Sequence, residues 1–312
     1  MTDLPIPRTP SLLARAIDSD IFYSFRRSRL TMVAAAVVFV LLMMALFAPL
    51  LVVQNPFDPA QLELINSRIS PLWTAEGQRP FLLGTDEQGR DIYSAILYGM
   101  RISLVVGVLG VSFAAVLGIG LGLSAGYGGG AVDSLIMRIA DVQLTFPAIL
   151  IALLIDGVVK SALGNHLDAS TTLIVLVVAI GLSFWVQYAR TVRGSVMVEK
   201  NKDYVAAAQL IGLPARVIMI RHVLPNTMGP ILVIATINLA LAIITEATLS
   251  FLGSGMPDTM PSLGTLIRIG NNYLFSGEWW VIAFPGLALA SLILSINLLG
   301  DWLRDALNPK LQ

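Results

Sequence analysis

Cysteine does not occur in the chain of 312 residues, and histidine occurs only twice. No disulfide can therefore form, and no thiolate is available for metal or redox chemistry. Acidic and basic residues number 20 each, so a formal net charge of zero gives no sign of a nucleic-acid partner. The phosphate-binding pattern GxxxxGK[ST] and the zinc-protease pattern HExxH are both absent. We expect no catalytic residue, no metal and no cofactor bound by this chain.

Apolar residues, by contrast, are abundant. They make up 56% of the chain, charged residues only 13%, and the mean hydropathy is +0.78, as in a polytopic membrane protein. Six apolar runs occur, at residues 30–53, 102–125, 135–155, 172–188, 231–252 and 280–299. Each is close to the ~20 residues that cross a hydrocarbon core, and the first is too long for a cleavable signal peptide. We predict an all-α membrane protein with six transmembrane helices, the first retained as an anchor.

Six spans place both termini on one side of the membrane, and the positive charges indicate which side. Of the 20 lysines and arginines, 14 fall on the side of the termini and six on the other. Since cytoplasmic loops are enriched in lysine and arginine, both termini are predicted to be cytoplasmic. The chain then divides into a cytoplasmic segment 1–29, a transmembrane helix 30–53, an external loop 54–100, a membrane domain 101–300 and a cytoplasmic tail 301–312.

The external loop becomes more structured from Leu82 onward. Thr85 followed three residues later by Gln88 resembles a capping box, and from Asp91 apolar positions recur at helical spacing. We predict a short interfacial helix that leads into the second span. The alternative is a solvated connector whose only role is packing on the bundle.

The second span is rich in glycine, with five between residues 107 and 122. Small residues at such spacing let helices approach closely in lipid. They predict helix packing here rather than a ligand site.

The stretch from Asp203 to Asn226, called here the 203–226 element, is too polar to span a bilayer and lies between two apolar runs. Tyr204, Ala207, Ala208 and Ile211 share one helical face, which the alanines keep shallow. Gly212 permits a left-handed helix end, Pro214 suits a new first turn, and Pro225 stops the second helix. We predict a bent pair of short helices in the cytoplasm, with an apolar face that lets another protein approach.

Several predicted spans carry polar residues that are costly in lipid and are therefore functional candidates. Arg138 and Asp141 are three residues apart and close enough to pair across one turn, just before a kink expected at Pro147. A structural and a functional role are both open for that pair. Glu246 has no obvious partner nearby in the sequence, which favours a pathway or inter-subunit role. The remaining candidates are Asn238 and Asn297.

The 203–226 element resembles the "EAA" coupling loop of permeases in bacterial ATP-binding-cassette importers. That pattern is EAA, three residues, Gly, nine residues and then I-x-L-P. The matching positions are Ala207, Ala208, Gly212, Leu224 and Pro225. Ala206 stands at the Glu position and His222 at the Ile position, and both departures are similar to the peptide-permease branch, where DYVxAA and RHxLPN are usual.

Four further stretches resemble that branch in the same order, from about residue 20 onward: LLGTDEQGRDIYSAILYGMRISL, MRIADVQLTFP, EATLSFLG and NLLGDWLRDALNPKL. One departure is Leu263, where the family commonly has Trp. The chain is identified as a member of the C-type permease subunits of dipeptide, oligopeptide and nickel importers.

The resemblance implies a type I importer permease fold of six transmembrane helices, with cytoplasmic coupling helices within 201–226 between spans 4 and 5. It implies a bacterial inner-membrane location and a heterodimer with a second permease. Two ATPase subunits that use ATP and Mg²⁺, and an extracytoplasmic binding protein, complete the importer. The coupling residues that it implies are Asp203, Tyr204, Ala207, Ala208, Gly212, Leu224, Pro225 and Asn226. A peptide cargo is expected, although nickel chelates and glutathione-like molecules are carried by similar permeases.

Two other classes of protein fit the sequence less well. An ion-coupled secondary transporter of small polar solutes would need its own coupling site, and the chain shows neither repeated halves nor corresponding interrupted helices. An intramembrane enzyme is disfavoured because the chain has two histidines, no cysteine and no HExxH.

Overall fold

A computed structural model describes residues 20–164 and 168–307 of the chain. The predictions for residues 1–19 and 308–312 lie outside the described residues. The described part is almost entirely helical, and its only strand-like feature is a single antiparallel bridge between Thr85 and Asp91. The longer helices are α2 (Asp20–Arg27), α3 (Arg29–Leu46), α5 (Ile92–Gly128), α6 (Gly130–Leu144), α7 (Ala148–Leu163), α8 (Ala169–Glu199), α9 (Asp203–Leu210), α12 (Met228–Phe251), α13 (Leu263–Asn271) and α14 (Trp280–Ala306). The short turns are α4 (Ala48–Leu51), η1 (Pro59–Gln61), η2 (Leu64–Asn66), α10 (Ala215–Val217), η3 (Ile218–Val223), α11 (Leu224–Asn226) and η4 (Leu274–Ser276).

Five of these helices, α3, α5, α8, α12 and α14, are long and apolar enough to cross a membrane. The predicted span 135–155 is instead a broken pair, α6 and α7, bent by 94°. Pro147 carries no backbone N–H and disfavours helical backbone at the preceding residue, so the kink expected there becomes a complete break. The two halves have 15 and 16 residues, each short of the ~20 that span a bilayer. The six predicted spans are present only when this pair counts as one.

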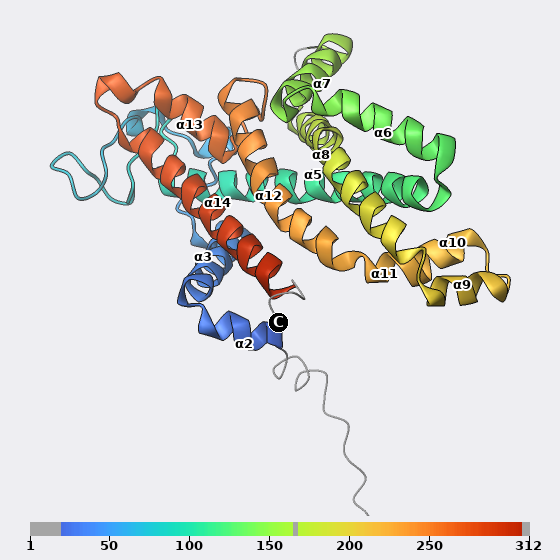
Figure 1. The fold of residues 1–312 in the computed structure, drawn as a ribbon. Helices are drawn as coiled ribbons and strands as arrows, with labels where there is room; N and C mark the ends of the chain where they lie inside the picture. The colour runs from blue at the N-terminus through green and yellow to red at the C-terminus, as the bar shows by residue number, and fades with distance from the viewer. Residues whose placement is uncertain (1–19, 165–167, 308–312) are drawn as a thin grey trace, which may run out of the picture.

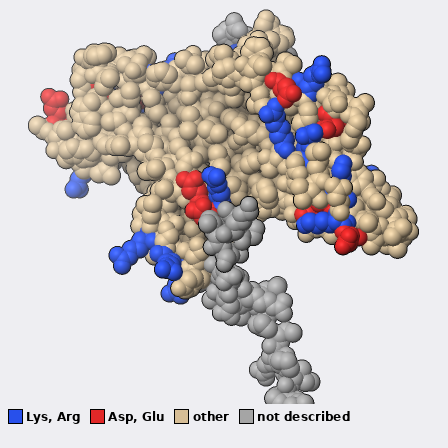
Figure 2. Space-filling view, in the orientation of Figure 1, with Lys and Arg blue, Asp and Glu red and all other residues tan. Residues whose placement is uncertain are grey.

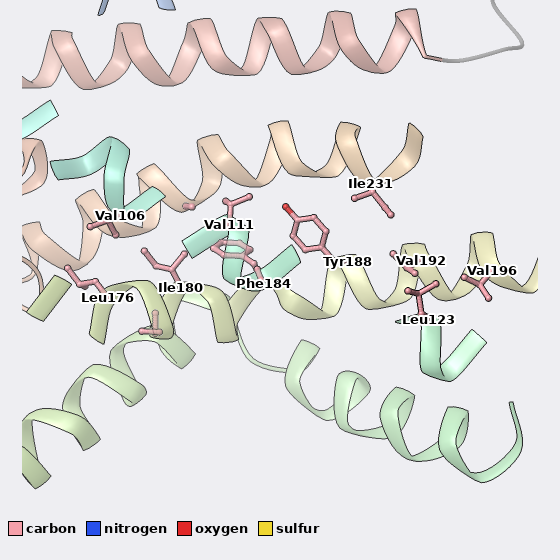
Figure 3. Close-up of a cluster of buried hydrophobic side chains, with 14 of the residues drawn as sticks. Val106, Val111, Leu123, Leu176, Ile180, Phe184, Tyr188, Val192, Val196 and Ile231 are labelled. Atoms are coloured by element: carbon pink, nitrogen blue, oxygen red, sulfur yellow. The ribbon is translucent and has the colours of Figure 1, made fainter. Parts of the chain in front are cut away.

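The centre of the fold is α5, which packs along α8 over much of its length (Figure 1). Gly118 and Gly122 of α5 lie against the backbone of α8, and a Cβ at Gly122 would come within 2.6 Å of the carbonyl oxygen of Ala189. Figure 3 shows the buried cluster that α5, α8 and α12 form beside this contact, including Val106, Ile180 and Ile231. The prediction that the glycines of this helix serve close packing is confirmed at these positions, although Gly120 meets no neighbour.

Three helix boundaries differ from the prediction. No separate interfacial helix precedes the second span, because α5 runs without a break over 37 residues, about 55 Å, from Ile92. Its cap is Asp91, which accepts a hydrogen bond of 2.8 Å from the backbone N–H of Ser94, and not Thr85. Likewise, α14 continues to Ala306, beyond the predicted apolar run 280–299 and into the predicted tail 301–312. The backbone hydrogen bonds of a helix do not depend on the hydropathy of its side chains. The more polar residues beside these two apolar runs therefore stay helical and lengthen α5 and α14.

The two ends of the bundle carry different structures. At one end lie the 54–91 segment and α13, and at the opposite end α9, α10 and α11 project from the bundle (Figure 1). The described chain ends lie close together, since α2 packs on the end of α14 and the rings of Phe25 and Trp302 are 5.2 Å apart, edge to face. Figure 2 shows a broad surface without charged residues in the middle of the visible face, with Lys, Arg, Asp and Glu toward its edges.

Candidate functional site

The 203–226 element is a bent pair of short helices, as predicted. The first helix, α9, ends at Leu210, and Gly212 then adopts a left-handed φ of +80°. The backbone N–H of Leu213 donates to the carbonyl of Ala208 at 3.1 Å, which closes the turn. Pro214 follows in extended conformation as the cap of α10. The bend therefore comes from a glycine that tolerates positive φ and a proline that fits a first turn.

The second half of the element contains a widened helical turn that the sequence did not indicate. Residues Ile218–Val223 form a π-helix, which runs into α11 (Leu224–Asn226). The side-chain amide of Asn226 donates to the carbonyl oxygen of His222 at 2.7 Å, and so satisfies a group that this irregular end exposes. The helix continues one residue past Pro225, and the break before α12 falls at Thr227. Leu224 and Pro225 thus lie in the joint between the projecting element and α12.

The faces of α9 differ by about one position from the prediction. Val205 and Ala208 point into the chain's own core, where Ala208 is only 4% exposed and packs near Ile218 and Val223. Ala208 therefore cannot form the surface that a partner meets. With three consecutive alanines, the helix could turn either of two sides toward the core. The burial of Val205 decides which side is observed.

The exposed face of α9 is mostly apolar. Leu210 is 88% and Ile211 75% exposed, and Asp203, Ala206 and Ala207 are exposed on the same side. Gly212 is exposed at the turn, and a Cβ added to it would meet nothing within 4 Å. Large apolar side chains so fully exposed on a helix that projects from the bundle indicate a contact surface for another polypeptide.

One hydroxyl ties the element together. The Tyr204 hydroxyl donates to Oε2 of Glu199 at 2.6 Å and accepts from the amide of Asn226 at 3.3 Å. The ammonium of Lys202 holds Oε1 of the same carboxylate at 2.6 Å. Partial burial raises the pKa of Tyr204, and its bond to the Glu199 carboxylate raises that pKa further. The end of α8, α9 and α11 are thereby joined at a single side chain, which is half-buried rather than part of the exposed face.

Two more contacts, one from the end of α8 and one from the element, reach the end of α5. The ammonium of Lys200 donates to the carbonyl oxygen of Gly126 at 2.8 Å, and the amide of Gln209 donates to the Tyr127 hydroxyl at 3.3 Å. Lys200, Glu199 and Tyr127 were not among the predicted coupling residues. The spacing of Glu199 and Lys202, three apart on a helix end, was a signal for an ion pair.

The predicted pair of Arg138 and Asp141 does not form. Asp141 forms its salt bridge with Arg190 of α8 instead. Asp133 pairs with Arg193 of α8, whose Nη2 also donates to Oδ2 of Asp133 at 2.7 Å. These salt bridges link α6 to α8. For Asp141, the partner is therefore Arg190 on the neighbouring helix and not Arg138 on its own helix. Arg138 is exposed and borders a shallow apolar hollow formed by Leu135, Ile139, Val142 and Gln143.

Glu246 is completely buried and does have a partner nearby in the sequence, contrary to expectation. Its Oε1 accepts from the hydroxyl of Ser250, four residues on, and its Oε2 accepts from that of Ser103 in α5, both at 2.7 Å. The Ser103 hydroxyl also accepts from the backbone N–H of Leu263 at 3.3 Å. This carboxyl group therefore joins α5, α12 and the first residue of α13. Leu263 itself is fully buried.

The other polar candidates lie apart from Glu246. Asn238 is buried eight residues earlier on α12, about 12 Å along the helix, and its side-chain atoms have no hydrogen-bond partner in the described chain. The hydroxyl of Tyr188 points toward α12 in this region (Figure 3). Asn297 is half-buried on α14, and Arg138 and Asp141 lie on α6, which packs on α5 and α8. The predicted polar residues thus do not form one site.

The bent span, the five long apolar helices and the helical element that projects between α8 and α12 define a polytopic membrane protein. Residues 118–312 match the family described as binding-protein-dependent transport system inner membrane component. Residues 19–71 match the N-terminal TM domain of oligopeptide transport permease C. The chain therefore belongs to the family of binding-protein-dependent transport system inner membrane components.

Relatives match along nearly the whole chain. The chain is 34% identical to the dipeptide transport system permease protein DppC of Haemophilus influenzae, covering 100% of both chains. It is 37% identical to the di/tripeptide transport system permease protein DppC of Pseudomonas aeruginosa, covering 97% of this chain and 95% of the other. The oligopeptide transport system permease protein OppC of Bacillus subtilis is 33% identical over 94% of this chain and 90% of its own length.

Among solved structures, an inward-facing MetNI methionine ABC transporter contains a chain of similar fold. The TM-score is 0.53 at 19% identity, over 69% of this chain and 96% of the other. At this identity the likeness concerns the fold alone, and it agrees with the predicted importer permease architecture.

Proposed function

We propose that this chain is a permease subunit of an ATP-driven importer and that, with a second permease, it forms a pathway for di- or oligopeptides across the bacterial inner membrane. The relatives support the cargo class, since those described above are permeases of dipeptide, di/tripeptide and oligopeptide transport systems. An extracytoplasmic binding protein delivers the peptide to the α13 end, and the opposite end faces the cytoplasm.

The exposed face of α9 is the observation that carries the ATP-driven part of the proposal. Leu210 and Ile211 stand outside the bundle with most of their apolar surface exposed. Burial of such surface in a groove of an ATPase subunit is favourable by about 25 cal/mol per Å². A large exposed side chain flanked by small ones, Ala206 and Ala207, fits a groove closely and can act as an anchor. Two ATPase subunits, one under each permease, would bind ATP and Mg²⁺ and hydrolyse the nucleotide.

The joint around Tyr204 supports a mechanical role for the element. When the ATPase subunits close, a force on α9 is passed to α8 through Glu199 and to α11 and α12 through Asn226. Packed helices transmit such displacements as rigid bodies because interiors are dense and resist compression. The permease thus changes access to its pathway with energy that enters from its partners.

The experiment that tests this function is uptake of a labelled dipeptide by proteoliposomes holding the complete importer, with the binding protein outside and ATP inside. Uptake should require ATP and should cease in a Leu210→Asp variant, while the permease still inserts. Uptake that continues after ATP depletion, with the ion gradients clamped, would instead identify an ion-coupled secondary transporter.

A further inference from the structure

A hollow of about 230 Å³ opens at the α13 end of the bundle. Four separate segments contribute its walls: the 54–91 segment, the first turns of α5, the start of α8 and the loop after α12. The lining residues are Phe57, Tyr98, Arg101, Ile102, Val105, Leu173 and Met260. All but Arg101 are apolar or aromatic, so the hollow has one cationic group against an apolar wall.

Arg101 differs from three other arginines at this end. Arg68, Arg90 and Arg268 each form a salt bridge, with Glu278, Asp86 and Asp258 respectively. Arg101 forms no hydrogen bond or ion pair within the described part of the chain, and its side chain is exposed. A guanidinium presents several N–H donors in a planar fork that matches a carboxylate. It is therefore a cation whose binding capacity the described chain leaves unused.

The place of Arg101 along α5 suits a ligand that arrives from outside. It lies nine residues after the start of the helix, about 14 Å along the axis, where the apolar run that begins at Ile102 takes over. Leu173 lies in the second turn of α8, at the same end. The rings of Phe57 and Tyr98 are 5.0 Å apart, edge to face, and form a rigid aromatic wall beside the cation.

We infer that this hollow is an entry subsite of the permease and that Arg101 there binds the C-terminal carboxylate of the peptide. The aromatic and aliphatic walls receive the last side chain of the peptide. An arginine fork and a carboxylate form paired, charge-assisted hydrogen bonds, which are stronger than neutral ones. The inference rests on the proposed import of peptides and adds to it a specificity-determining residue in the permease.

The test compares uptake of Ala-Phe with uptake of Ala-Phe amide, which lacks the carboxylate, by the complete importer. Wild-type and Arg101→Gln complexes are assayed with the same binding protein, so any change in preference arises in the permease. We expect the ratio of uptake rates, acid over amide, to fall roughly tenfold in R101Q, mainly through loss of acid uptake. The Arg101→Lys variant keeps the charge without the fork and should retain part of the preference. Arg79→Gln, at an exposed loop position that does not line the hollow, should leave the ratio unchanged.

Each outcome decides between distinct explanations. If R101Q slows acid and amide equally, Arg101 acts through a lipid phosphate or through packing, and the carboxylate subsite is wrong. If R101Q does not assemble with the ATPase subunits, R101K is decisive, because a ratio of one in that variant also overturns the subsite. If the wild-type complex transports neither peptide with ATP present, the proposed function itself fails.

Discussion

The 85–91 segment with α13 at one end of the bundle, and the 203–226 element at the other, differ in what covers their side chains. Arg90 is 1% exposed, and Nε lies 2.6 Å from Oδ2 of Asp86 while Nη1 donates to the carbonyl of Asp258 at 2.7 Å. The indole N–H of Trp280 donates to the carbonyl of Thr85 at 3.2 Å. In the 203–226 element, by contrast, Leu210 and Ile211 stand largely uncovered.

The difference separates a part that the chain completes by itself from a part that it leaves open. The Asp86–Arg90 ion pair is buried, and each side chain also bonds to backbone, while Nη2 of Arg90 has no partner in the described chain. The pair gives a fixed surface at the α13 end. An exposed apolar helix face gains stability only when another polypeptide covers it. The 85–91 segment with α13 therefore holds a fixed shape by its own contacts, whereas α9 keeps an apolar face uncovered.

The largest expected effect is at the buried ion pair. Replacement of Asp86 by Ala leaves the Arg90 guanidinium buried without a counter-charge, and should lower the free energy of unfolding by about 3–5 kcal/mol. Unfolding of the detergent-solubilised chain in SDS, followed by circular dichroism, measures this. Asp258→Ala breaks an ion pair whose partners are 31% and 48% exposed, so its cost should stay below about 1 kcal/mol. If Asp86→Ala and Asp258→Ala lowered the free energy of unfolding equally, burial would not be what makes the Asp86–Arg90 pair important.

The second effect concerns partner binding rather than stability. Leu210→Asp places a charge on the exposed face, and should weaken co-purification of the ATPase subunits at least ~30-fold, or about 2 kcal/mol, as for an interface anchor. Stability of the permease alone should change by less than about 0.5 kcal/mol. Ala207→Glu should act in the same direction, because the carboxylate would be buried unpaired.

A matched control exists at the other end. Leu64 in η2 is also highly exposed, so Leu64→Asp makes the same chemical change on the opposite side. ATPase co-purification should be unaffected. If the two leucines give the same result, the face of α9 has no special role.

The third effect is backbone strain in the turn. Gly212 has φ +80°, and a Cβ added there would have no neighbour within 4 Å. Gly212→Val therefore meets no clash but should cost about 1–2 kcal/mol in a left-handed conformation. The strain reorients α9 relative to α10, and we expect more ATP hydrolysed per peptide transported. Gly157→Ala in α7, also without neighbours but not at a positive φ, should leave that ratio unchanged.

The smallest effect is at the joint. Tyr204→Phe removes the hydroxyl that bridges Glu199 and Asn226, at a cost of about 1 kcal/mol, while Lys202 still pairs with Glu199. The ATP-to-peptide ratio should rise modestly with ATPase binding intact. Tyr127→Phe, which removes one 3.3 Å contact, serves as the control with almost no change. An ATP-to-peptide ratio identical in both variants would show that the bridge transmits nothing.

Local signals in the sequence predicted the bent element well and its faces poorly. Gly212 and Pro214 act through their own backbone preferences, so the bend was visible without any tertiary information. The phase of α9 depends on whether Val205 or Ala207 meets η3, and three consecutive alanines do not distinguish these. The exposure of Leu210 was missed for that reason.

Contacts between distant segments were beyond reach of the sequence pattern. Ser103 meets Glu246 across 143 positions, and Arg90 meets Asp258 across 168. Asp141 pairs with Arg190 because α6, which ends at a 94° break, packs against α8, and a proline predicts a kink but not its size. Residues that act locally were thus predictable, whereas partners chosen by packing were not.

The absence of cysteine from the chain makes one measurement especially direct. Leu210→Cys and Ala208→Cys variants are treated with a membrane-impermeant maleimide in right-side-out and inside-out vesicles, with and without the ATPase subunits. We predict that Cys at 210 reacts only from the cytoplasmic face and is protected when the ATPase subunits are bound, while Cys at 208 reacts in neither case. Labelling of position 210 from outside, or labelling that the ATPase subunits do not change, would contradict a projecting α9 that receives the ATPase.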